Sequence, residues 1–388
     1  MSKPTVLHAL YSYLPVTQNW IYAQLRFNDF CNHSVISITE ENASQFPLQN
    51  RYTAFARNSL MDRIQLLLAW YWVRQPEAFF ASVLTTVSPD IVHGHFAPEA
   101  WRLLPLVRKT GIPMVTTFYG LDVDKLPRRR FWKQRYPQIF DYSSFVLVEG
   151  PFMGKRLEAI GCPAEKIEVV SLGVDRTRYT TASLQRTRNS DEPVHVLFVG
   201  LNREKKGSRD AATIFAEAAK QDNRLELHVV GTGHYRTAVE RILKKEGVFE
   251  RAVFHGELSF ERYCRVLAES DILLAPSCYA SDGDCEGGAP VVCIEAQVAG
   301  LPVIGTKHCD IPHVVHHKES GLLSQEHDIA SMVYDLLYLA SDKDARRKMG
   351  EYGKEHTERH HDIHRQVERI SEVYRLAVER RKVDGSTV

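Results

Sequence analysis

Two series of short apolar runs, each alternating with segments of helical periodicity, constrain the fold of this chain more than any other feature. Such alternation is typical of parallel sheets built from strand–helix–strand units. The strands expected in the first half are Thr5–Leu10, Ser34–Ile38, Ile91–His95, Pro113–Phe118 and Ser144–Glu149, and those expected in the second half are Val194–Val199, Glu226–Val230, Ala252–Phe254, Ile272–Ala275 and Pro302–Gly305. The sequence therefore predicts an α/β protein with two separate sheets.

The chain has 388 residues, more than one hydrophobic core usually serves. We expect residues 1–180 to form one doubly wound, Rossmann-like domain, 193–362 to form a second, and 363–388 to form a C-terminal helix and tail that crosses back to the first. The segment between the two series is polar and rich in turn formers, so we interpret 181–192 as a hinge linker. Two such domains facing each other would bind a ligand in a cleft at the carboxyl ends of their strands. Helices with apolar residues three and four positions apart are expected at Arg209–Lys220, Tyr235–Gly247, Phe260–Glu269 and Ile363–Arg381.

The composition excludes several classes of protein. Hydrophobic residues make up 44% and charged residues 25%, which excludes a disordered, collagenous or coiled-coil chain. The formal net charge of +1 argues against a nucleic-acid-binding protein, although residues 1–190 carry 22 Lys and Arg against 15 Asp and Glu. The seven cysteines form no Cys-x-x-Cys pair, so neither a disulfide framework nor a metal site is predicted. With no signal peptide and no apolar run of about 18 residues, a cytoplasmic protein is expected.

Two glycine turns in the second half have the residue types of an anion site. Val194–Val199 leads into a turn with two glycines and three basic residues, namely Gly200, Arg203, Lys205, Lys206 and Gly207, and Gly231 and Gly233 follow the next strand. Glycine lets backbone N–H groups approach an anion, and lysine and the following helix N-terminus add positive charge. The turns point to a diphosphate site, but a solvated basic turn explains the same composition equally well. Neither turn has the spacing of a dinucleotide fingerprint or a P-loop.

The segment Ser281–Pro302 carries two acids around a glycine-rich loop. Glu286 opens a loop of Gly287, Gly288, Ala289 and Pro290, which leads into an expected helix bearing Glu295. The first carboxylate can accept sugar hydroxyls, the loop N–H groups can hold phosphate, and the second carboxylate can bind a ribose diol. The alternative, a solvated loop acid and an exposed helix acid, is less favoured because the flanking residues are apolar.

From Val199 to Leu323 the ordered motifs resemble the C-terminal domain of the family 4 retaining glycosyltransferases, which have the GT-B fold. These motifs are VGLNREKKG, HVVGTG, Phe254-His255-Gly256-Glu257, DILLAPS, EGGAPVVCIEAQVAGLPVIGT, His308–Pro312 and Gly321-Leu322-Leu323. The resemblance implies that a nucleotide-activated sugar is transferred to a hydroxyl with retention, without a metal or another cofactor. It implies that the donor is bound by Gly200, Arg203, Lys206, Gly231, Gly233, Glu257, Glu286, the 287–290 backbone and Glu295, with Glu286 on the sugar and Glu295 on the ribose.

Two positions depart from the family pattern. Eight residues separate Glu286 from Glu295, where the family usually has seven, and we expect the loop to absorb the additional residue. Leu201 stands where the family commonly has Arg, and we expect Arg203 to supply the missing charge.

The first half resembles bacterial exopolysaccharide and O-antigen transferases more loosely. The matching segments are Tyr13–Trp20, His93–Phe96 and Thr116–Asp122. Many relatives have a histidine facing the reacting sugar where this chain has Tyr119. We therefore expect His95, Tyr119 and Asp122 to orient the acceptor hydroxyl and to act with Glu286 in catalysis. For His93 and His95, capping of a strand end is an alternative of nearly equal weight.

The segment Asp124–Phe140 mixes six basic residues with Phe131, Trp132 and Tyr136. Such a patch suits the anionic surface of a membrane, where each basic residue contributes roughly 1 kcal/mol and aromatic rings lie among the headgroups. The expected acceptor is a saccharide linked to polyprenyl diphosphate, presented at that surface. A solvated basic loop is the alternative.

Two other functions remain open from the sequence. A nucleotide-sugar epimerase of the same fold would need no acceptor, whereas a phosphorylase would need pyridoxal phosphate and a longer chain. A non-catalytic nucleotide-sugar-binding protein is compatible with Leu201, Tyr119 and the longer spacing of the two acids.

Overall fold

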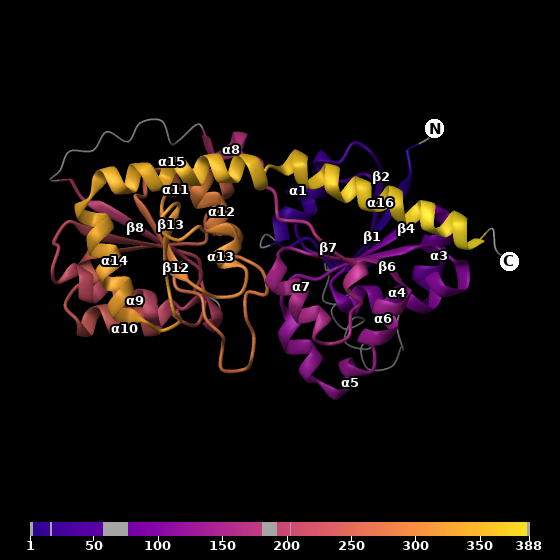
Figure 1. Cartoon of the computed structure of the whole chain (residues 1–388), viewed down its shortest axis with the longest axis horizontal. Helices are drawn as coiled ribbons and strands as arrows, with labels where there is room; N and C mark the ends of the chain where they lie inside the picture. Colours follow the sequence, from indigo (N-terminus) through magenta and orange to yellow (C-terminus); the bar gives the residue numbers. More distant parts are fainter. Residues whose placement is uncertain (1–2, 16–17, 57–76, 181–191, 202, 386–388) are drawn as a thin grey trace. The chain divides into compact units, whose positions relative to one another are not determined.

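The computed structural model describes residues 3–15, 18–56, 77–180, 192–201 and 203–385, coloured along the chain in Figure 1. The chain divides into two compact units. The first comprises Met1–Glu149, Gly154–Gly173 and Ile363–Val388, and the second comprises Gly150–Met153 and Val174–Asp362. Almost all of the expected linker, 181–192, lies outside the described residues.

The first unit has a seven-stranded parallel sheet in the order β3-β2-β1-β4-β5-β6-β7. Five strands lie where the apolar runs predict them: β1 (Thr5–Tyr13), β2 (Asn32–Glu40), β4 (Ile91–His95), β5 (Met114–Thr117) and β6 (Ser143–Val148). The edge strands β3 (Arg51–Ala56) and β7 (Ile167–Val169) are additional. The strand order reverses between β1 and β4, which is where ligands bind in open α/β sheets.

Helices of the first unit pack on this sheet, and the last of them comes from the far end of the sequence. They are α1 (Asn19–Phe27), α3 (Glu77–Val87), α4 (Ala97–Thr110), α5 (Arg130–Lys133), α6 (Tyr136–Tyr142), α7 (Pro151–Glu158) and α16 (Ile363–Gly385). Ile370, Val373, Tyr374 and Ala377 of α16 are buried against the strands in one apolar cluster, and Figure 1 shows this helix running along the unit. The expectation that the C-terminal helix returns to the first domain is confirmed.

The second unit has a six-stranded parallel sheet in the order β10-β9-β8-β11-β12-β13. Its strands are β8 (Val194–Val199), β9 (Leu225–Val230), β10 (Ala252–Gly256), β11 (Ile272–Ala275), β12 (Val303–Thr306) and β13 (Gly321–Ser324), of which only β13 was not expected. The helices are α8 (Thr177–Thr180), α9 (Ser208–Ala219), α10 (Arg236–Lys245), α11 (Phe260–Glu269), α12 (Val291–Val298), α13 (Ile311–Val314), α14 (Ile329–Ser341) and α15 (Lys343–His360). The order reverses between β8 and β11, so the loops after these strands form the expected ligand edge.

Among the described residues, no helix is both long and apolar enough to cross a membrane.

Candidate active site

The glycine turns of the second unit meet at the carboxyl ends of β8 and β9. Gly200 and Gly231 have φ angles of 123° and 113°, which residues other than glycine rarely adopt. A Cβ atom on Gly231 would lie 3.6 Å from the backbone nitrogen of Gly200. Gly207, with φ of 67°, packs still more closely, because a Cβ atom there would lie 1.9 Å from the carbonyl oxygen of Pro276. These glycines let β8, β9 and β11 end within reach of one another and start α9 beside them.

Lys206 and Glu286, 80 residues apart in the sequence, form an ion pair at this edge. The Lys206 ammonium lies 3.0 Å from the Glu286 carboxylate, which also accepts a 2.9 Å hydrogen bond from Ser277 Oγ. Burial alone would raise the pKa of Glu286, but the charges of Lys206 and Lys205 outweigh it and hold this pKa below its ordinary value. The carboxylate is therefore charged at neutral pH and can accept hydrogen bonds from hydroxyl groups.

The loop that carries Glu286 is fixed from both sides. On one side, Lys205 Nζ donates a 2.7 Å hydrogen bond to the carbonyl oxygen of Cys285. On the other side, Gly287 has a φ of 76°, and Pro290 lies at the N-cap of α12. Gly287–Pro290 thus lie in irregular chain between Glu286 and the start of α12 at Val291.

Glu295 lies within α12, and each of its carboxylate oxygens accepts a hydrogen bond from a tyrosine hydroxyl. Tyr179 of α8 donates at 2.8 Å and Tyr263 of α11 donates at 2.6 Å. Burial raises the pKa of Glu295, and the two hydrogen bonds oppose that rise. Neither tyrosine was predicted as a site residue, since nothing in their local pattern separates them from ordinary helix residues.

The other expected donor residues differ in exposure. Arg203 and Glu257 are exposed, as is Gly233, whereas Leu201 is only 1% exposed and belongs to the apolar core of the unit. Gly288, Ala289 and Pro290 are buried in the loop before α12. The departure at Leu201 is therefore explained by packing, and Arg203 is the most exposed of the three basic residues of this turn.

In the first unit, His95 and Tyr119 are joined at the carboxyl ends of β4 and β5. Tyr119 Oη lies 2.8 Å from His95 Nδ1, His95 Nε2 lies 3.0 Å from His8 Nδ1, and His8 Nε2 lies 2.9 Å from His33 Nδ1. His33 Nε2 ends the series at 2.8 Å from the carbonyl oxygen of Asn28. Burial lowers the pKa of each of these histidines, that of His95 to about 3, so all three rings are neutral at pH 7.

The carbonyl oxygen of Asn28 sets the direction of this series of hydrogen bonds. A carbonyl can only accept, so His33 donates from Nε2 and accepts at Nδ1. The same logic makes His8 and His95 donate from Nε2 and makes the Tyr119 hydroxyl donate to His95. The register of β1 and β4 pairs His8 with His93, which places His8 next to the end of β4 that carries His95.

Asp122 is completely buried, and its carboxylate is occupied by backbone groups. It accepts hydrogen bonds from the N–H groups of Ala97, Tyr119 and Gly120 at 2.9, 3.0 and 3.2 Å. Burial raises the pKa of Asp122 to about 6 against the lowering effect of these bonds. In this geometry Asp122 fixes the start of α4 and the loop that carries Tyr119.

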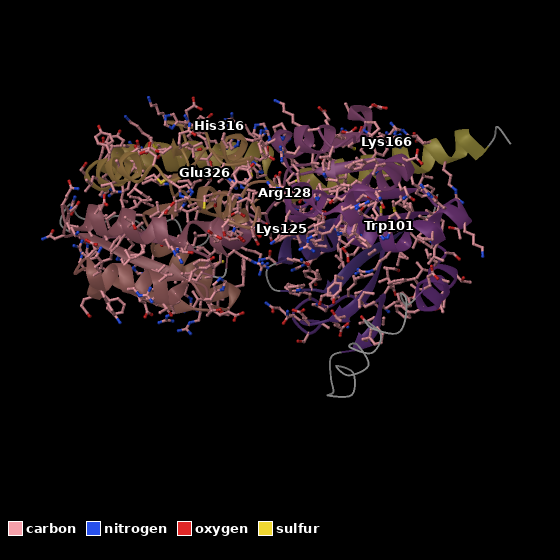
Figure 2. The ribbon with its side chains drawn as sticks, turned by 90° about the horizontal axis from the view of Figure 1, so that it is seen from below. Trp101, Lys125, Arg128, Lys166, His316 and Glu326 are labelled. Carbon is pink, nitrogen blue, oxygen red and sulfur yellow. The ribbon has the colours of Figure 1, made fainter. Side chains whose placement is uncertain are left out.

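The basic segment Asp124–Phe140 is divided between surface and core. Exposed side chains are those of Arg128, Arg129, Arg130, Phe131 and Lys133, with Phe131 59% exposed; Lys125 and Arg128 are labelled in Figure 2. Tyr136 and Phe140 are buried, so the expectation that Tyr136 belongs to a surface patch is wrong. Its ring packs on Phe118 and Phe140, and its hydroxyl donates to the carbonyl oxygen of Asp122.

Comparisons with known proteins show the family and the fold of the chain. Residues 181–356 match the family model "Glycosyl transferases group 1", and residues 32–178 match "Glycosyltransferase Family 4". The chain is 27% identical to a putative colanic acid biosynthesis glycosyltransferase of Escherichia coli K12 over 85% of this chain and 77% of that one. It is 30% identical to an amylovoran biosynthesis glycosyltransferase of Erwinia amylovora over 64% of this chain and 60% of the relative. A structure of Anabaena HepE with UDP-glucose superposes with a TM-score of 0.74 at 16% identity, covering 95% of this chain and 98% of that one.

Proposed function

Because the chain belongs to the group 1 and family 4 glycosyltransferases, we propose that it moves a hexosyl group from a nucleoside-diphosphate sugar to a hydroxyl of a saccharide acceptor, with retention. The observation that carries the donor half of this proposal is the Lys206–Glu286 pair among the glycine turns of β8 and β9. The names of the two relatives, which concern colanic acid and amylovoran, support a role in bacterial polysaccharide biosynthesis.

The donor diphosphate is held by Lys206, Arg203 and the N–H groups of 287–290 in this proposal. Without a ligand, Lys206 is neutralised by Glu286. A bound diphosphate replaces Glu286 as the partner of the Lys206 ammonium. The Glu286 carboxylate can then accept hydrogen bonds from hydroxyl groups of the donor sugar. Positive charge fixed beside the leaving diphosphate is the kind of contribution that usually lowers such a barrier most.

Glu295 is the proposed ligand of the donor ribose. Each of its oxygens has a second lone pair besides the one used by Tyr179 or Tyr263. The tyrosines hold the carboxylate in one orientation, so binding a diol there costs little conformational entropy of the Glu295 side chain.

Tyr119 is the proposed contact to the acceptor. His95 is fully buried, whereas Tyr119 retains 9% exposure and has its hydroxyl oriented by the histidines behind it. In this proposal Tyr119 touches the acceptor, and His95 and Asp122 position it.

The donor site is tested by thermal shift of the whole chain with UDP, GDP, ADP and dTDP, each with and without magnesium. At a hundred times its dissociation constant, one diphosphate is expected to stabilise the protein by about 2.7 kcal/mol, and equally without metal. Sugars of that base are then assayed for transfer. Lys206→Met is expected to abolish the shift, and Lys245→Met on the exposed face of α10 is the control. No response to any of the four nucleotides would refute the proposal.

We further propose that the acceptor is linked to polyprenyl diphosphate and that residues Arg128–Lys133 contact an anionic membrane. The exposed basic side chains and Phe131 support this contact. The test is sedimentation with phosphatidylglycerol and with phosphatidylcholine vesicles at low salt. Binding only to the anionic vesicles, lost in Arg128→Glu/Arg130→Glu and kept in the control Lys245→Glu, is expected. If the double variant Arg128→Glu/Arg130→Glu binds anionic vesicles as well as the control Lys245→Glu does, the membrane contact is refuted.

A further inference from the structure

Four side chains from three separate segments of the second unit converge beside the loop of Glu286. The thiol of Cys285, the imidazole of His308 and the thiol of Cys309 have ligand atoms that all lie within 4.8 Å of one another. Glu326, in the loop after β13 and labelled in Figure 2, lies 2.7 Å from His308 Nδ1. Cys285 and His308 are buried, and Cys309 is half-buried.

The backbone brings adjacent residues to the same point. Cys309 has a φ of 47°, which turns its side chain back toward its neighbour, so that Cys309 Sγ lies 3.2 Å from His308 Nε2. Cys309 and Cys285 also share a hydrogen bond. A positive φ at a residue other than glycine or asparagine is uncommon and costs energy, and such outliers gather at functional sites.

The orientation of His308 is the one that metal-bound histidines have. A ligating histidine usually donates its second ring N–H to a carboxylate, which fixes the ring and raises its basicity. Glu326 takes that position at Nδ1, which leaves the lone pair of Nε2 directed toward the two thiols. At present the Glu286 N–H donates to Nε2 at 3.2 Å.

From this geometry we propose that Cys285, His308 and Cys309 bind one Zn²⁺ ion, with Glu326 as the partner that orients His308. Two thiolates and one imidazole are a ligand set that zinc favours, and three protein ligands leave the fourth tetrahedral position open. With Zn–S bonds of about 2.3 Å and Zn–N bonds of about 2.0 Å, tetrahedral ligand atoms lie roughly 3.3–3.8 Å apart. All present separations are at most 4.8 Å, and that of Cys309 Sγ from His308 Nε2 is 3.2 Å, so shifts of roughly 1 Å bring the three atoms to those values.

The other two clusters of this kind among the described residues are weaker candidates. In the first unit, His8, His93 and His95 contain no thiol, and none of their ring nitrogens is hydrogen-bonded to a carboxylate that would orient a ligating ring. His195, Glu226 and His228 are half-buried and contain no thiol.

Zinc binding would act on the donor loop. A metal ion on Nε2 takes the lone pair that now accepts from the Glu286 backbone, and it ties Cys285, the residue before Glu286, to the segment after β12. The ion would therefore rigidify the loop without contacting the sugar. This inference does not depend on the proposed transfer reaction, because its readouts are metal binding and absorption.

The experiment is anaerobic titration of the reduced, metal-free whole chain with Co²⁺, followed by displacement with Zn²⁺. We expect one equivalent of Co²⁺ to give a near-ultraviolet thiolate-to-cobalt charge-transfer band and the visible absorption of a tetrahedral site, both removed by Zn²⁺. Cys285→Ser and Cys309→Ser are each expected to weaken or abolish the band. Cys264→Ser, which alters a half-buried thiol of α11 outside the cluster, is expected to leave it unchanged.

A second variant separates a metal site from a merely structural cluster. Glu326→Gln keeps all three ligands, so the band is expected to persist while Zn²⁺ affinity, measured against a chromophoric chelator, falls about 10- to 100-fold. Circular dichroism confirms that each variant is folded. Absence of stoichiometric binding, or a band that survives in both Cys285→Ser and Cys309→Ser, would overturn the assignment.

Discussion

Replacing Lys206 by Met should make the stability of the second domain depend on pH in a new way. The side chain of Lys206 is 24% exposed and that of Glu286 only 6%, so the substitution leaves a buried carboxylate without its cation. Removing one partner of a buried pair costs 3–5 kcal/mol, and the partial exposure of Lys206 places the expected loss at the lower end, about 3 kcal/mol at pH 7.

The sign of the pH dependence follows from the pKa of Glu286. In the native protein this pKa is lowered, so its stabilising contribution is present above the ordinary carboxyl pKa and is lost as the pH falls. In the variant, burial is opposed only by Lys205 and Ser277, and about 3 kcal/mol corresponds to a rise of roughly two pKa units. The variant is then destabilised as the pH rises, because the carboxyl must ionise in a buried site. The difference between the two proteins is thus largest at pH 7 and smallest near pH 4.

Differential scanning calorimetry from pH 4 to pH 7.5 measures this difference. For a domain of this size, about 3 kcal/mol corresponds to a decrease in Tm of roughly 6–12 °C at pH 7, shrinking severalfold by pH 4. The double variant Lys206→Met/Glu286→Gln should lose the additional pH dependence of the single variant, since no carboxyl remains to ionise at position 286. A Tm difference that stays constant across this pH range would refute the argument.

Three further predictions concern other parts of the two domains. Gly207→Ala should destabilise the second domain by about 3 kcal/mol, because the new methyl group meets Pro276 and the residue is held at positive φ. Gly111→Ala, at a similar φ but with nothing within 4 Å, should cost about 1 kcal/mol. Both losses are measured by denaturant unfolding, and equal losses would contradict the role of the Pro276 contact. Asp122 has a folded pKa of about 6, above that of the unfolded chain, so the first domain should lose about 2 kcal/mol of stability as the pH rises from 4 to 7. Asp122→Asn should flatten that decline in urea titrations, and an unchanged slope would show that the carboxyl does not titrate there. At pH 7, long-range ¹H–¹⁵N correlation spectra should find His8, His33 and His95 all neutral with the proton on Nε2, and a proton on Nδ1 of any of them would disprove the direction assigned to the series.

Long apolar strands and their order along the chain were predictable from local pattern. The strands that were missed are short or lie at sheet edges, as with β3, RYTAFA, and the three residues of β7. Their pairing depends on neighbours distant in sequence, which no local periodicity reveals. The same holds for β13, a four-residue strand at the edge of the second sheet, where a Cβ atom on Gly321 would lie 2.2 Å from the carbonyl oxygen of Val303.

The residues of the candidate site likewise fall into those that local sequence predicts and those that only tertiary packing brings together. Lys206, Glu286 and the glycines carry their own signals, because their residue types are unusual at the ends of strands. Tyr179 and Tyr263 acquire their contact with Glu295 only through packing of α8, α11 and α12. Tyr136 was misplaced because its neighbours are basic and exposed, while the helix α6 turns its ring inward.

The place of α16 in the chain has a consequence for biosynthesis. This helix completes the core of the first domain, where Tyr374 Oη lies 2.6 Å from His93 Nδ1, yet it follows the whole of the second domain in the sequence. At a translation rate of 5–20 residues per second, the ribosome needs about 10–40 s to make the intervening residues 174–362. During that interval Val6, Ile91 and Phe145 lack the side chains of α16 that share their apolar cluster, so we expect the nascent first domain to expose apolar surface until α16 has been made.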